Sequence, residues 1–475
     1  MTDSASGLVA RAHDARIVVV GGGLAGLVAA LECARVGIGV TLLEATDRLG
    51  GGILAADLDG RTVDGGADAF EPPAGAFAAL LEDLGLSGDV DLPAADALWV
   101  SGLPGGPAPL PEQSILGIPA NPFADDVRRL IGWRGAWRAY LDRLRPPLTI
   151  GHARSLGDLV RTRMGDRVAE RMLAPAVRAR FGVAPERLEV DAAVPGLNGA
   201  LTRAGSLSGA VAELLASREE RPARATLRGG LTRLADALEE RLAVLEVTVH
   251  RGTRVQALAR TESGWLVTGE PREGDAPAEV RADAVIVATG EAEARRLLQT
   301  FAVPPAHEPP AAARDVVTLL VDAPALDGAP RGTTVSGADG TVLHHLTARW
   351  PSLAEACGPG CHVLRVVAAS RGDADDAVVD HALRAAATMT DVPLTRAQLR
   401  GAHRLRVVPP VPVAVIGHAA AVDAVRAGAH AAGLALTGGW LTGGDPARIA
   451  ADAVAEADLV RGNALWGTPL GHSTH

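Results

Sequence analysis

The first fifty residues alternate short apolar runs with glycine-rich turns. Residues 16–20 read Arg-Ile-Val-Val-Val, a β-branched run of the kind that is buried in a parallel sheet. Gly-Gly-Gly-Leu-Ala-Gly follows at 21–26, and residues 27–35 then have helical spacing. A second apolar run at 39–43 ends in Glu44. The pattern therefore predicts a strand, a glycine turn, a helix and a second strand.

Helical and strand patterns separate along the rest of the chain. Helical signals dominate residues 73–216. Alternating β-branched residues near 244–267, 316–321 and 362–367 predict strands. A further strand is predicted within 282–289, and a strand, a glycine turn and a helix are predicted from 433 onward. These patterns favour an α/β protein with a large helical portion.

The turn at 21–26 has the spacing of a dinucleotide-binding loop. Gly21 permits a tight turn, Gly23 lets backbone amides approach a pyrophosphate, and Gly26 lets the helix pack closely on the strand. Glu44 falls where a carboxylate can accept hydrogen bonds from a ribose diol. A glycine turn by itself also has a purely structural interpretation, but strand, helix, second strand and terminal acid agree here. The sequence therefore predicts a dinucleotide site.

Composition and charge exclude several classes of function. The chain has 475 residues, of which 48% are hydrophobic and 21% charged, so it is long enough for two or three domains with large cores. Its net charge of -10 disfavours nucleic-acid binding. All 46 basic residues are arginine, which excludes a pyridoxal Schiff base and a P-loop lysine.

The cysteines and the N-terminus bear on location. Cys33, Cys357 and Cys361 are too few for a disulfide framework and favour a reducing cytoplasm. Cys357 and Cys361 flank Gly-Pro-Gly without a second ligand pair nearby, so no metal site is expected. Residues 1–15 lack the apolar core of a signal peptide, and the apolar stretch 17–31 is shorter than a bilayer span. We expect a cytoplasmic protein without a transmembrane segment.

Four segments resemble flavoproteins of the amine-oxidase and protoporphyrinogen-oxidase superfamily. Residues 44–51 resemble the continuation of the dinucleotide motif, in which the arginine and the glycine pair lie along the FAD phosphates. Residues 64–70, Asp-Gly-Gly-Ala-Asp-Ala-Phe, resemble the segment that passes beside the isoalloxazine. In 252–255 the family's valine touches the adenine side, and 443–446 precede a helix that the family aims at the flavin. The resemblance implies FAD as the cofactor.

The motif and the resemblance together give a set of candidate cofactor-binding residues. They are Gly21, Gly22, Gly23, Leu24, Ala25, Gly26, Glu44, Ala45, Arg48, Gly51, Gly52, Gly66, Ala67, Asp68, Ala69, Val255, Gly443, Gly444, Asp445 and Pro446. Because the turn at 443–446 contains no cysteine or histidine, we expect FAD to be bound non-covalently. No catalytic acid or base and no metal ligand is assigned.

The middle of the chain resembles a narrower group, the bacterial oxygen-dependent protoporphyrinogen and coproporphyrinogen oxidases. The matching segments are 117–122, 125–140, 149–152, 155–159, 228–234, 345–350 and 360–365, and the whole resemblance covers about 16–461. It implies a Rossmann-like FAD domain assembled from 1–75, 222–300 and 400–475. A mainly helical lobe at 76–221 and a mixed β-sheet substrate domain at 301–399 are inserted into it.

The resemblance implies oxidation of coproporphyrinogen III to coproporphyrin III in haem biosynthesis. Six electrons would leave in three rounds of hydride transfer to FAD, with O2 as acceptor and peroxide as product. No second GxGxxG follows a strand, which favours an oxidase over an NAD(P)H-linked reductase. The implied partners are the porphyrinogen substrate, O2 and a haem-pathway enzyme.

Two alternatives stay open. The flavoenzyme can act on protoporphyrinogen IX or an amine, although amine oxidases typically place a lysine near the flavin and this chain has none. A non-catalytic protein that binds FAD or porphyrin is motivated by departures at Arg178, Arg180 and Asp445, and Asp96 stands at about the place of a substrate-binding arginine in eukaryotic relatives. Arginines near 128–145 and at 178 and 180 are candidates for the substrate propionates, although any single one of them is interpreted first as part of a solvated helix face. Aromatics at 133–140 are interpreted as core in preference to a porphyrin platform.

Overall fold

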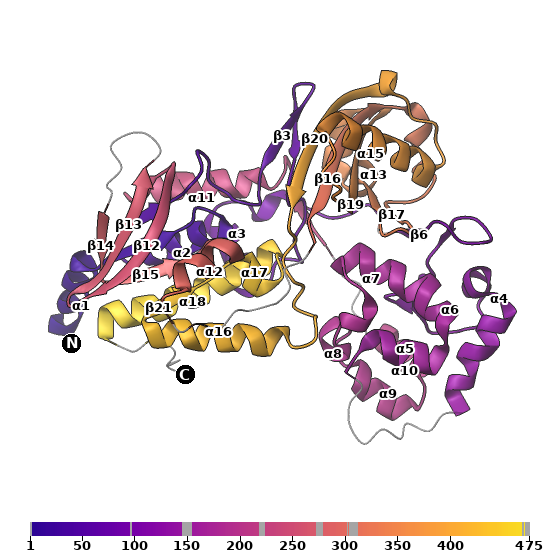
Figure 1. The fold of residues 1–475 in the computed structure, drawn as a ribbon, viewed down its shortest axis with the longest axis horizontal. Helices are drawn as coiled ribbons and strands as arrows, with labels where there is room; N and C mark the ends of the chain where they lie inside the picture. The colour runs from indigo at the N-terminus through magenta and orange to yellow at the C-terminus, as the bar shows by residue number, and fades with distance from the viewer. Residues whose placement is uncertain are drawn as a thin grey trace.

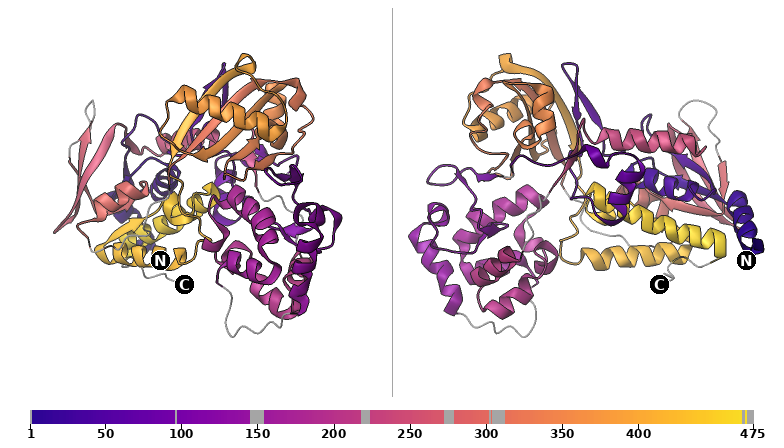
Figure 2. Two further views of the ribbon diagram at one scale, coloured as in Figure 1. Left: turned by 45° about the vertical axis from the view of Figure 1, so that its right-hand side comes forward. Right: turned by 180° about the vertical axis from the view of Figure 1, so that it is seen from behind.

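The computed structural model describes residues 2–95, 97–144, 154–217, 224–271, 279–301, 303, 312–467 and 470. Asp96 and the segment 149–152 lie outside these ranges. The molecule has an elongated α/β part that contains both ends of the chain, with a β-sheet unit and a helical unit beside it (Figure 1). A view from behind shows the same three parts (Figure 2).

A five-stranded parallel sheet forms the centre of the α/β part. Its strands in spatial order are β11 (Thr248–His250), β2 (Gly39–Leu43), β1 (Arg16–Val20), β15 (Ala284–Val287) and β21 (Leu434–Leu436). In its register Val18 lies opposite Thr41 on one side and Val285 on the other. Both strands predicted in the first fifty residues are confirmed, because their apolar residues are buried in this sheet.

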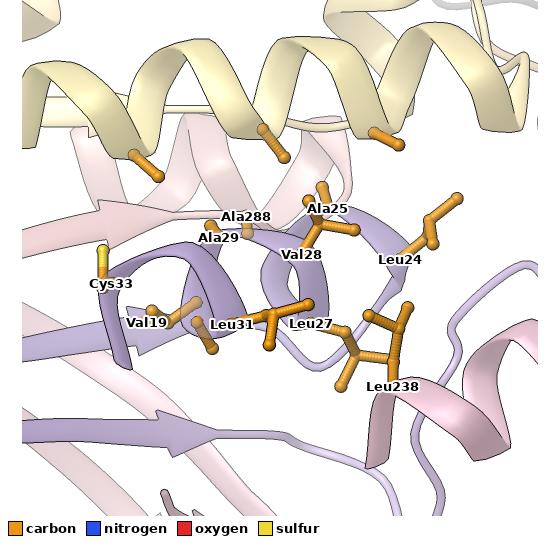
Figure 3. Close-up of a cluster of buried hydrophobic side chains, with 14 of the residues drawn as sticks. Val19, Leu24, Ala25, Leu27, Val28, Ala29, Leu31, Cys33, Leu238 and Ala288 are labelled. Carbon is orange, nitrogen blue, oxygen red and sulfur yellow. The ribbon is translucent and has the colours of Figure 1, made fainter. Parts of the chain in front are cut away.

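Helices cover one face of this sheet. Every residue of α2 (Leu24–Ala34) is buried, and the helix packs against α18 (Pro446–Trp466) and α11 (Thr232–Val244). Leu27, Leu31 and Leu238 lie in the core between them (Figure 3). Helices α1 (Thr2–Asp14) and α3 (Gly75–Asp83) complete this layer.

The opposite face carries an antiparallel sheet and three helices. The sheet consists of β12 (Thr253–Thr261), β13 (Gly264–Pro271) and β14 (Glu279–Ala282). With α12 (Glu291–Leu298), α16 (His418–Ala432) and the short α17 (Gly439–Thr442), it buries a second core around Trp265. The α/β part therefore has helices on one side and a mixed layer on the other.

A seven-stranded sheet forms the second unit. Its order is β20 (Leu399–Val407), β16 (Arg314–Asp322), β19 (Cys361–Ala369), β18 (Val342–His345), β17 (Thr334–Ser336), β6 (Leu98–Val100) and β7 (Ala108–Pro109). Helix α15 (Asp375–Thr390) packs on one face, while α13 (Leu346–Arg349), α14 (Pro351–Cys357) and the hairpin of β3 (Ala55–Leu58) and β4 (Arg61–Asp64) pack on the other. The hairpin packs residues 55–64 against this sheet.

The third unit is helical. It contains α4 (Asp125–Tyr140), α5 (Leu156–Met164), α6 (Asp166–Val168), a π-helical turn (Ala169–Leu173), α7 (Ala174–Phe181), α8 (Val190–Ala193), α9 (Leu197–Ala204) and α10 (Leu207–Ala216). Asp142 is fully buried and accepts hydrogen bonds from Arg163 Nε at 2.5 Å and from the backbone N–H of Leu207. This carboxylate ties the end of α4 to α5 and α10.

Short strand pairs and single helical turns connect the units. The pairs are β5 (Val90–Asp91) with β10 (Thr226–Leu227), and β8 (Ser114–Ile115) with β9 (Ile118–Pro119). Among the described helices, none has the length and apolar character that crossing a bilayer requires. The division at 75, 221, 300 and 399 stays a prediction, and strands β6 and β7 pair in the seven-stranded sheet although they lie within 76–221.

The interpretation of the aromatic residues on α4 as core is wrong. Trp133 and Trp137 are 60% and 57% exposed. Trp137 packs against Phe123, with the ring centroids 5.1 Å apart. The guanidinium of Arg128 lies 4.2 Å from the centroid of the Trp133 ring. Helical spacing predicts that these rings share one side of α4, but it does not predict which side of α4 packs against the rest of the helical unit.

Candidate cofactor-binding site

Two glycines of the 21–26 turn are required by close packing within the protein. A Cβ atom on Gly26 would lie 1.8 Å from the carbonyl oxygen of Gly21. Gly21 itself has φ +106°, and a Cβ there would lie 2.8 Å from the carbonyl oxygen of Ala288. The turn is therefore pressed between β1, β15 and α2, and only glycine fits at these two positions.

Gly23 is different, because the protein leaves space around it. It is the N-cap residue of α2 with φ −72° and ψ 177°, a conformation that other residues also adopt. A Cβ at Gly23 would meet nothing closer than Gly51 Cα at 3.8 Å, and a Cβ at Gly52 would meet nothing within 4 Å. No side chain caps α2 and its first turn has no acidic residue. An uncapped helix start beside open space is suited to a phosphate group.

The Glu44 carboxylate holds the turn in place. Its Oε2 accepts a hydrogen bond from Gly22 N at 2.6 Å, and its Oε1 accepts from the backbone N and the hydroxyl of Thr46, both at 2.8 Å. A carboxylate has about four lone-pair sites, so these three bonds leave capacity for a ribose hydroxyl. Glu44 therefore has a structural role in addition to the predicted one.

The loop after Glu44 folds back on the glycine turn. Gly50 N donates to Gly22 O at 2.9 Å, and the two segments form a short parallel bridge between Gly23 and Gly50. The Arg48 guanidinium donates to the carbonyl oxygens of Gly51 at 2.9 Å and Ile53 at 3.2 Å. Arg48 thus organises the loop 49–53, while Ala45 is exposed beside it.

The segment 64–70 runs directly against this loop. Ala67 N donates to Gly52 O at 3.0 Å, and a Cβ on Gly66 would lie 2.1 Å from the same oxygen. Ala69 and Phe70 are buried, and Phe70 pairs with Ala225. The backbone of 66–69 is therefore fixed next to 51–52.

Arg365, on β19 of the seven-stranded sheet, anchors the same segment from the other side. Its side chain is only 4% exposed and forms an ion pair with Asp68, with Nη1 2.9 Å from Oδ1. Nη1 also donates to Gly66 O at 2.9 Å, and Nη2 donates to Asp64 O. One guanidinium therefore fixes three positions of a seven-residue segment.

Charges around this segment shift its titrating groups. Burial, followed by the nearby Asp68 carboxylate, raises the pKa of Asp64 to about 7. Burial alone would raise the pKa of Asp68, but Arg365, His344, Arg349 and Arg224 together lower it. Burial lowers the pKa of His344 to about 4. At neutral pH the segment thus carries an ionised Asp68 held by several cations.

Asp445 connects the start of α18 to the end of the same segment. As N-cap residue it accepts a hydrogen bond from Ala447 N at 2.9 Å, and it also accepts from Glu71 N at 3.1 Å. Arg224 forms an ion pair with Asp445 at 2.6 Å and donates to Ala69 O at 2.7 Å. The departure at Asp445 is therefore part of a built junction in which a cation offsets its charge.

The remaining predicted residues lie at the two ends of this arrangement. Val255 is buried on β12, which begins at Thr253, and Thr253 N donates to Glu44 O at 2.8 Å. Gly443 and Gly444 have φ +77° and +85°, and Cβ atoms there would lie 2.9 Å from Val413 N and 2.5 Å from Pro410 Cγ. Pro446 is the first residue of α18. Each predicted segment thus touches the next, from β12 through Glu44, the glycine turn and 66–69 to Asp445.

Sequence reasoning missed Arg365 and Arg224, which hold the segments together. Arg365 lies in the matched segment 360–365, but nothing in that pattern shows that its side chain turns toward 64–68. Arg178 and Arg180 lie in the last turn of α7, whose C-cap Gly182 accepts a hydrogen bond from Arg314 at the start of β16 at 2.9 Å. These two arginines are therefore at the junction of the helical unit and the seven-stranded sheet.

Comparisons with known proteins agree with this architecture. Residues 24–405 match the family of flavin containing amine oxidoreductases. A coproporphyrinogen III oxidase of Propionibacterium freudenreichii subsp. freudenreichii is 30% identical, covering 98% of this chain and 95% of the relative. One from Mycobacterium bovis is 31% identical over 68% of this chain and 69% of the relative.

Solved structures share the fold. A candidate protoporphyrinogen oxidase from Exiguobacterium sp. 255-15 superposes with a TM-score of 0.79 at 23% identity, covering 94% of this chain and 98% of the other. The match includes all three units of the molecule. The chain therefore belongs to the flavin-containing amine oxidoreductases, in the branch that includes the bacterial coproporphyrinogen III oxidases.

Proposed function

We propose that this protein is an FAD-dependent oxidase that converts coproporphyrinogen III into coproporphyrin III with O2 as the acceptor. The observation that carries the proposal is the uncapped glycine start of α2 beside open space, in a chain whose relative of matching length is a coproporphyrinogen III oxidase. The reaction removes six electrons and six protons from the macrocycle, consumes three O2 and releases three H2O2.

In this proposal different groups of the predicted residues bind different parts of FAD. The N–H groups of Gly23 to Gly26 and the loop at 51–52 would hold the pyrophosphate, Glu44 would hold the ribose, and Val255 would face the adenine. The segment 66–69 and the turn 443–446 would contact the ring system. The cofactor is non-covalent, because neither segment contains a cysteine or a histidine. The pieces 1–75, 222–300 and 400–475 form its domain.

Bound FAD supplies the hydride acceptor, and the chain's own residues supply position and shielding. Arg365 and Arg224 keep the backbone of 64–69 in one conformation, since both donate to its carbonyl oxygens. The surrounding cations keep Asp68 ionised. Its carboxylate is paired with Arg365, so we assign it a positioning role and not that of a general base. The seven-stranded sheet excludes water from the far side of the segment through the apolar cluster around Ala69 and Leu320.

Protoporphyrinogen IX is the second candidate substrate. The observation that favours it is the structural likeness to the Exiguobacterium protein, which spans nearly the whole chain. The two substrates differ in their carboxylates, since coproporphyrinogen has four propionates and protoporphyrinogen has two. A haem-pathway enzyme that takes up the product is the protein partner we propose.

Anaerobic mixing of the purified protein with each porphyrinogen tests the proposal. We expect the visible flavin absorption to bleach with coproporphyrinogen III and to return when air is admitted, with porphyrin fluorescence appearing in the same step. Acid precipitation should release yellow FAD into the supernatant, whereas flavin retained on the pellet would contradict non-covalent binding. If neither porphyrinogen bleaches the flavin, the non-catalytic alternative replaces this proposal.

A further inference from the structure

Two of the three cysteines lie at one turn of the unit formed by the seven-stranded sheet. Helix α14 ends at Cys357, and β19 begins at Cys361. Between them Gly358 and Gly360 have φ +79° and +75°, and Cys361 N donates to Gly358 O at 3.3 Å. These left-handed glycines reverse the chain within three residues. The reversal brings both cysteines to the same apolar cluster, in which Cys357 is buried and against which Cys361 packs.

The surroundings give small molecules access to one of these thiols. Cys361 is partly exposed and lines a cavity of about 490 Å³ between α14, the start of β19 and the turn at 326–329. Cys357 is 7% exposed and packs in the apolar cluster with Trp350 and Val363. The pair therefore has an outer thiol at the cavity, which solutes can reach, and an inner thiol buried in the adjoining apolar cluster.

We propose that Cys357 and Cys361 are a modification site, at which the two thiols form a reversible intramolecular disulfide under peroxide. Both are free thiols in the reduced chain. The turn already holds them together, so ring closure needs little chain entropy to be lost beyond that of the folded protein. Nothing in the proposed oxidase chemistry uses either residue.

The reaction balances in two steps. The Cys361 sulfur attacks one oxygen of H2O2, the O–O bond breaks, and a sulfenic acid and one water form. The Cys357 sulfur then attacks the sulfenic sulfur, the S–O bond breaks, and the disulfide and a second water form. Two thiols are thereby oxidised by two electrons and one peroxide is reduced to two waters. An external dithiol reverses the modification.

The order of the steps follows from burial. Burial raises the pKa of Cys357 to about 11, with the neighbouring Cys361 thiol adding to the effect and Arg61 opposing it. Burial also raises the pKa of Cys33, to about 12, and that residue lies in the core of α2. Because Cys361 lines the cavity whereas Cys357 and Cys33 are buried, peroxide reaches Cys361 first and Cys33 remains a thiol.

The proposal rests on the proposed function for one point, the source of the oxidant. An oxidase that releases H2O2 at every turnover exposes its own surface to that oxidant. The site itself depends only on the two thiols and their access, so added H2O2 tests it without substrate. Failure of the modification and failure of the oxidase activity are therefore distinguishable.

The full-length protein, without substrate and under argon, is treated with H2O2, alkylated, and digested with trypsin. Because the chain has no lysine, cleavage after Arg349 and Arg365 puts both cysteines on the single peptide 350–365, while Cys33 lies on 17–35. We expect 350–365 to lose two hydrogen atoms and to escape alkylation, and dithiothreitol to restore alkylation at both positions. The peptide 17–35 should be alkylated at Cys33, after denaturation, equally with and without peroxide.

Two variants and one further arm complete the test. Cys357→Ser should stop the loss of hydrogens and leave Cys361 as a sulfenic or higher acid, while Cys361→Ser should leave Cys357 open to alkylation after denaturation. Turnover of coproporphyrinogen in air should give the same disulfide, and catalase should prevent it. Unchanged alkylation of 350–365 under peroxide, a disulfide between two copies, or sulfinic acid at Cys361 with Cys357 still a thiol would each overturn the proposal.

Discussion

Arg365 on β19 and Asp68 on the segment 64–70 form an ion pair of 2.9 Å that joins the seven-stranded sheet to the irregular chain following β4. Because the Arg365 side chain is buried and also serves the carbonyl oxygens of Asp64 and Gly66, its loss leaves a charge and two carbonyls without their donor. We expect Arg365→Met to lower the free energy of unfolding by about 3 to 5 kcal/mol. Urea unfolding monitored by circular dichroism measures this change.

The ion pair between Arg400 and Asp59 provides the matched control. Its atoms are 2.7 Å apart, but the two side chains are 53% and 43% exposed. Arg400→Met should therefore cost less than about 1 kcal/mol. If the two variants lowered the free energy of unfolding equally, Arg365 would contribute no more than an exposed ion pair. The role of Arg365 in fixing the segment 64–70 would then be wrong.

Gly23 and Gly26 are expected to fail in different ways when changed to alanine. Gly26→Ala should prevent folding or greatly destabilise the protein, because the added Cβ lies 1.8 Å from Gly21 O. Gly23→Ala should fold with nearly unchanged stability but lose FAD, because its Cβ enters space that the protein leaves open. Thermal unfolding of the flavin-free protein and FAD content after gel filtration separate the two effects.

Gly462→Ala on α18 is the control for these variants, since a Cβ at Gly462 would meet nothing within 4 Å. Removing a helical glycine there should stabilise the protein by about 0.4 to 1 kcal/mol and leave FAD content unchanged. Full FAD content in Gly23→Ala would place the pyrophosphate elsewhere.

Glu44→Ala should weaken FAD binding by about 1 to 3 kcal/mol, the usual cost of losing a charge-assisted hydrogen bond. The same variant also removes the acceptor for Gly22 N and Thr46 N, so part of the loss comes from a less ordered turn. Fluorescence titration of the flavin-free protein gives the affinity. Glu82→Ala, on the exposed face of α3, should bind FAD like the parent protein, and a Glu44→Ala protein with parental affinity would exclude Glu44 from the site.

Stability should fall in acid because of His345. Burial, with a smaller contribution from His362, lowers the pKa of His345 to about 4, whereas an unfolded histidine titrates near about 6.5. The unfolded chain therefore takes up a proton that the folded chain refuses, and this stability is complete above about pH 6.5 and lost as the pH falls to 4. His345→Gln should reduce the loss in unfolding free energy between about pH 7 and 4.5 by about 2.5 kcal/mol.

Asp64 should change the pH dependence of stability in the direction opposite to His345. Its pKa is raised to about 7, so its contribution to stability is present in acid and lost as the pH rises through 7. Asp64→Asn should therefore increase the difference in unfolding free energy between neutral and acid pH. Urea unfolding at several pH values measures both variants, and shifts of the same sign would contradict one of the two assignments.

The preferred porphyrinogen follows from the number of propionates. The chain carries only arginine as a strong base, and arginine binds carboxylates bidentately. We expect kcat/KM for coproporphyrinogen III to exceed that for protoporphyrinogen IX by at least about tenfold, or about 1.4 kcal/mol. Added salt should reduce the preference if exposed ion pairs supply it. Equal or reversed values would exclude this substrate assignment and leave the flavin oxidase intact.

The local sequence pattern predicted the strands at 16–20 and 39–43 to the residue, because short apolar runs rich in β-branched residues and bounded by glycine favour buried strands. It also explains Gly21 and Gly26, whose lack of a Cβ is a local requirement. It could not find Arg365, whose partner Asp68 lies almost three hundred residues earlier, since no periodicity relates them. The exposure of Trp133 and Trp137 was missed for the same reason, because burial depends on neighbours that the sequence does not name.

The order in which the five-stranded sheet receives its strands has a consequence for biosynthesis. Strand β15 ends at residue 287, but β21, which pairs with its open edge, begins at residue 434. At about 5 to 20 residues per second, the ribosome needs roughly 7 to 30 s to make the intervening chain. During that interval the apolar edge of Ala284–Val287 stands unpaired, and unpaired edges invite pairing with other chains. We therefore expect this edge to stay open until residues 434–436 have emerged, and a chain truncated before residue 434 to aggregate more readily than the parent chain.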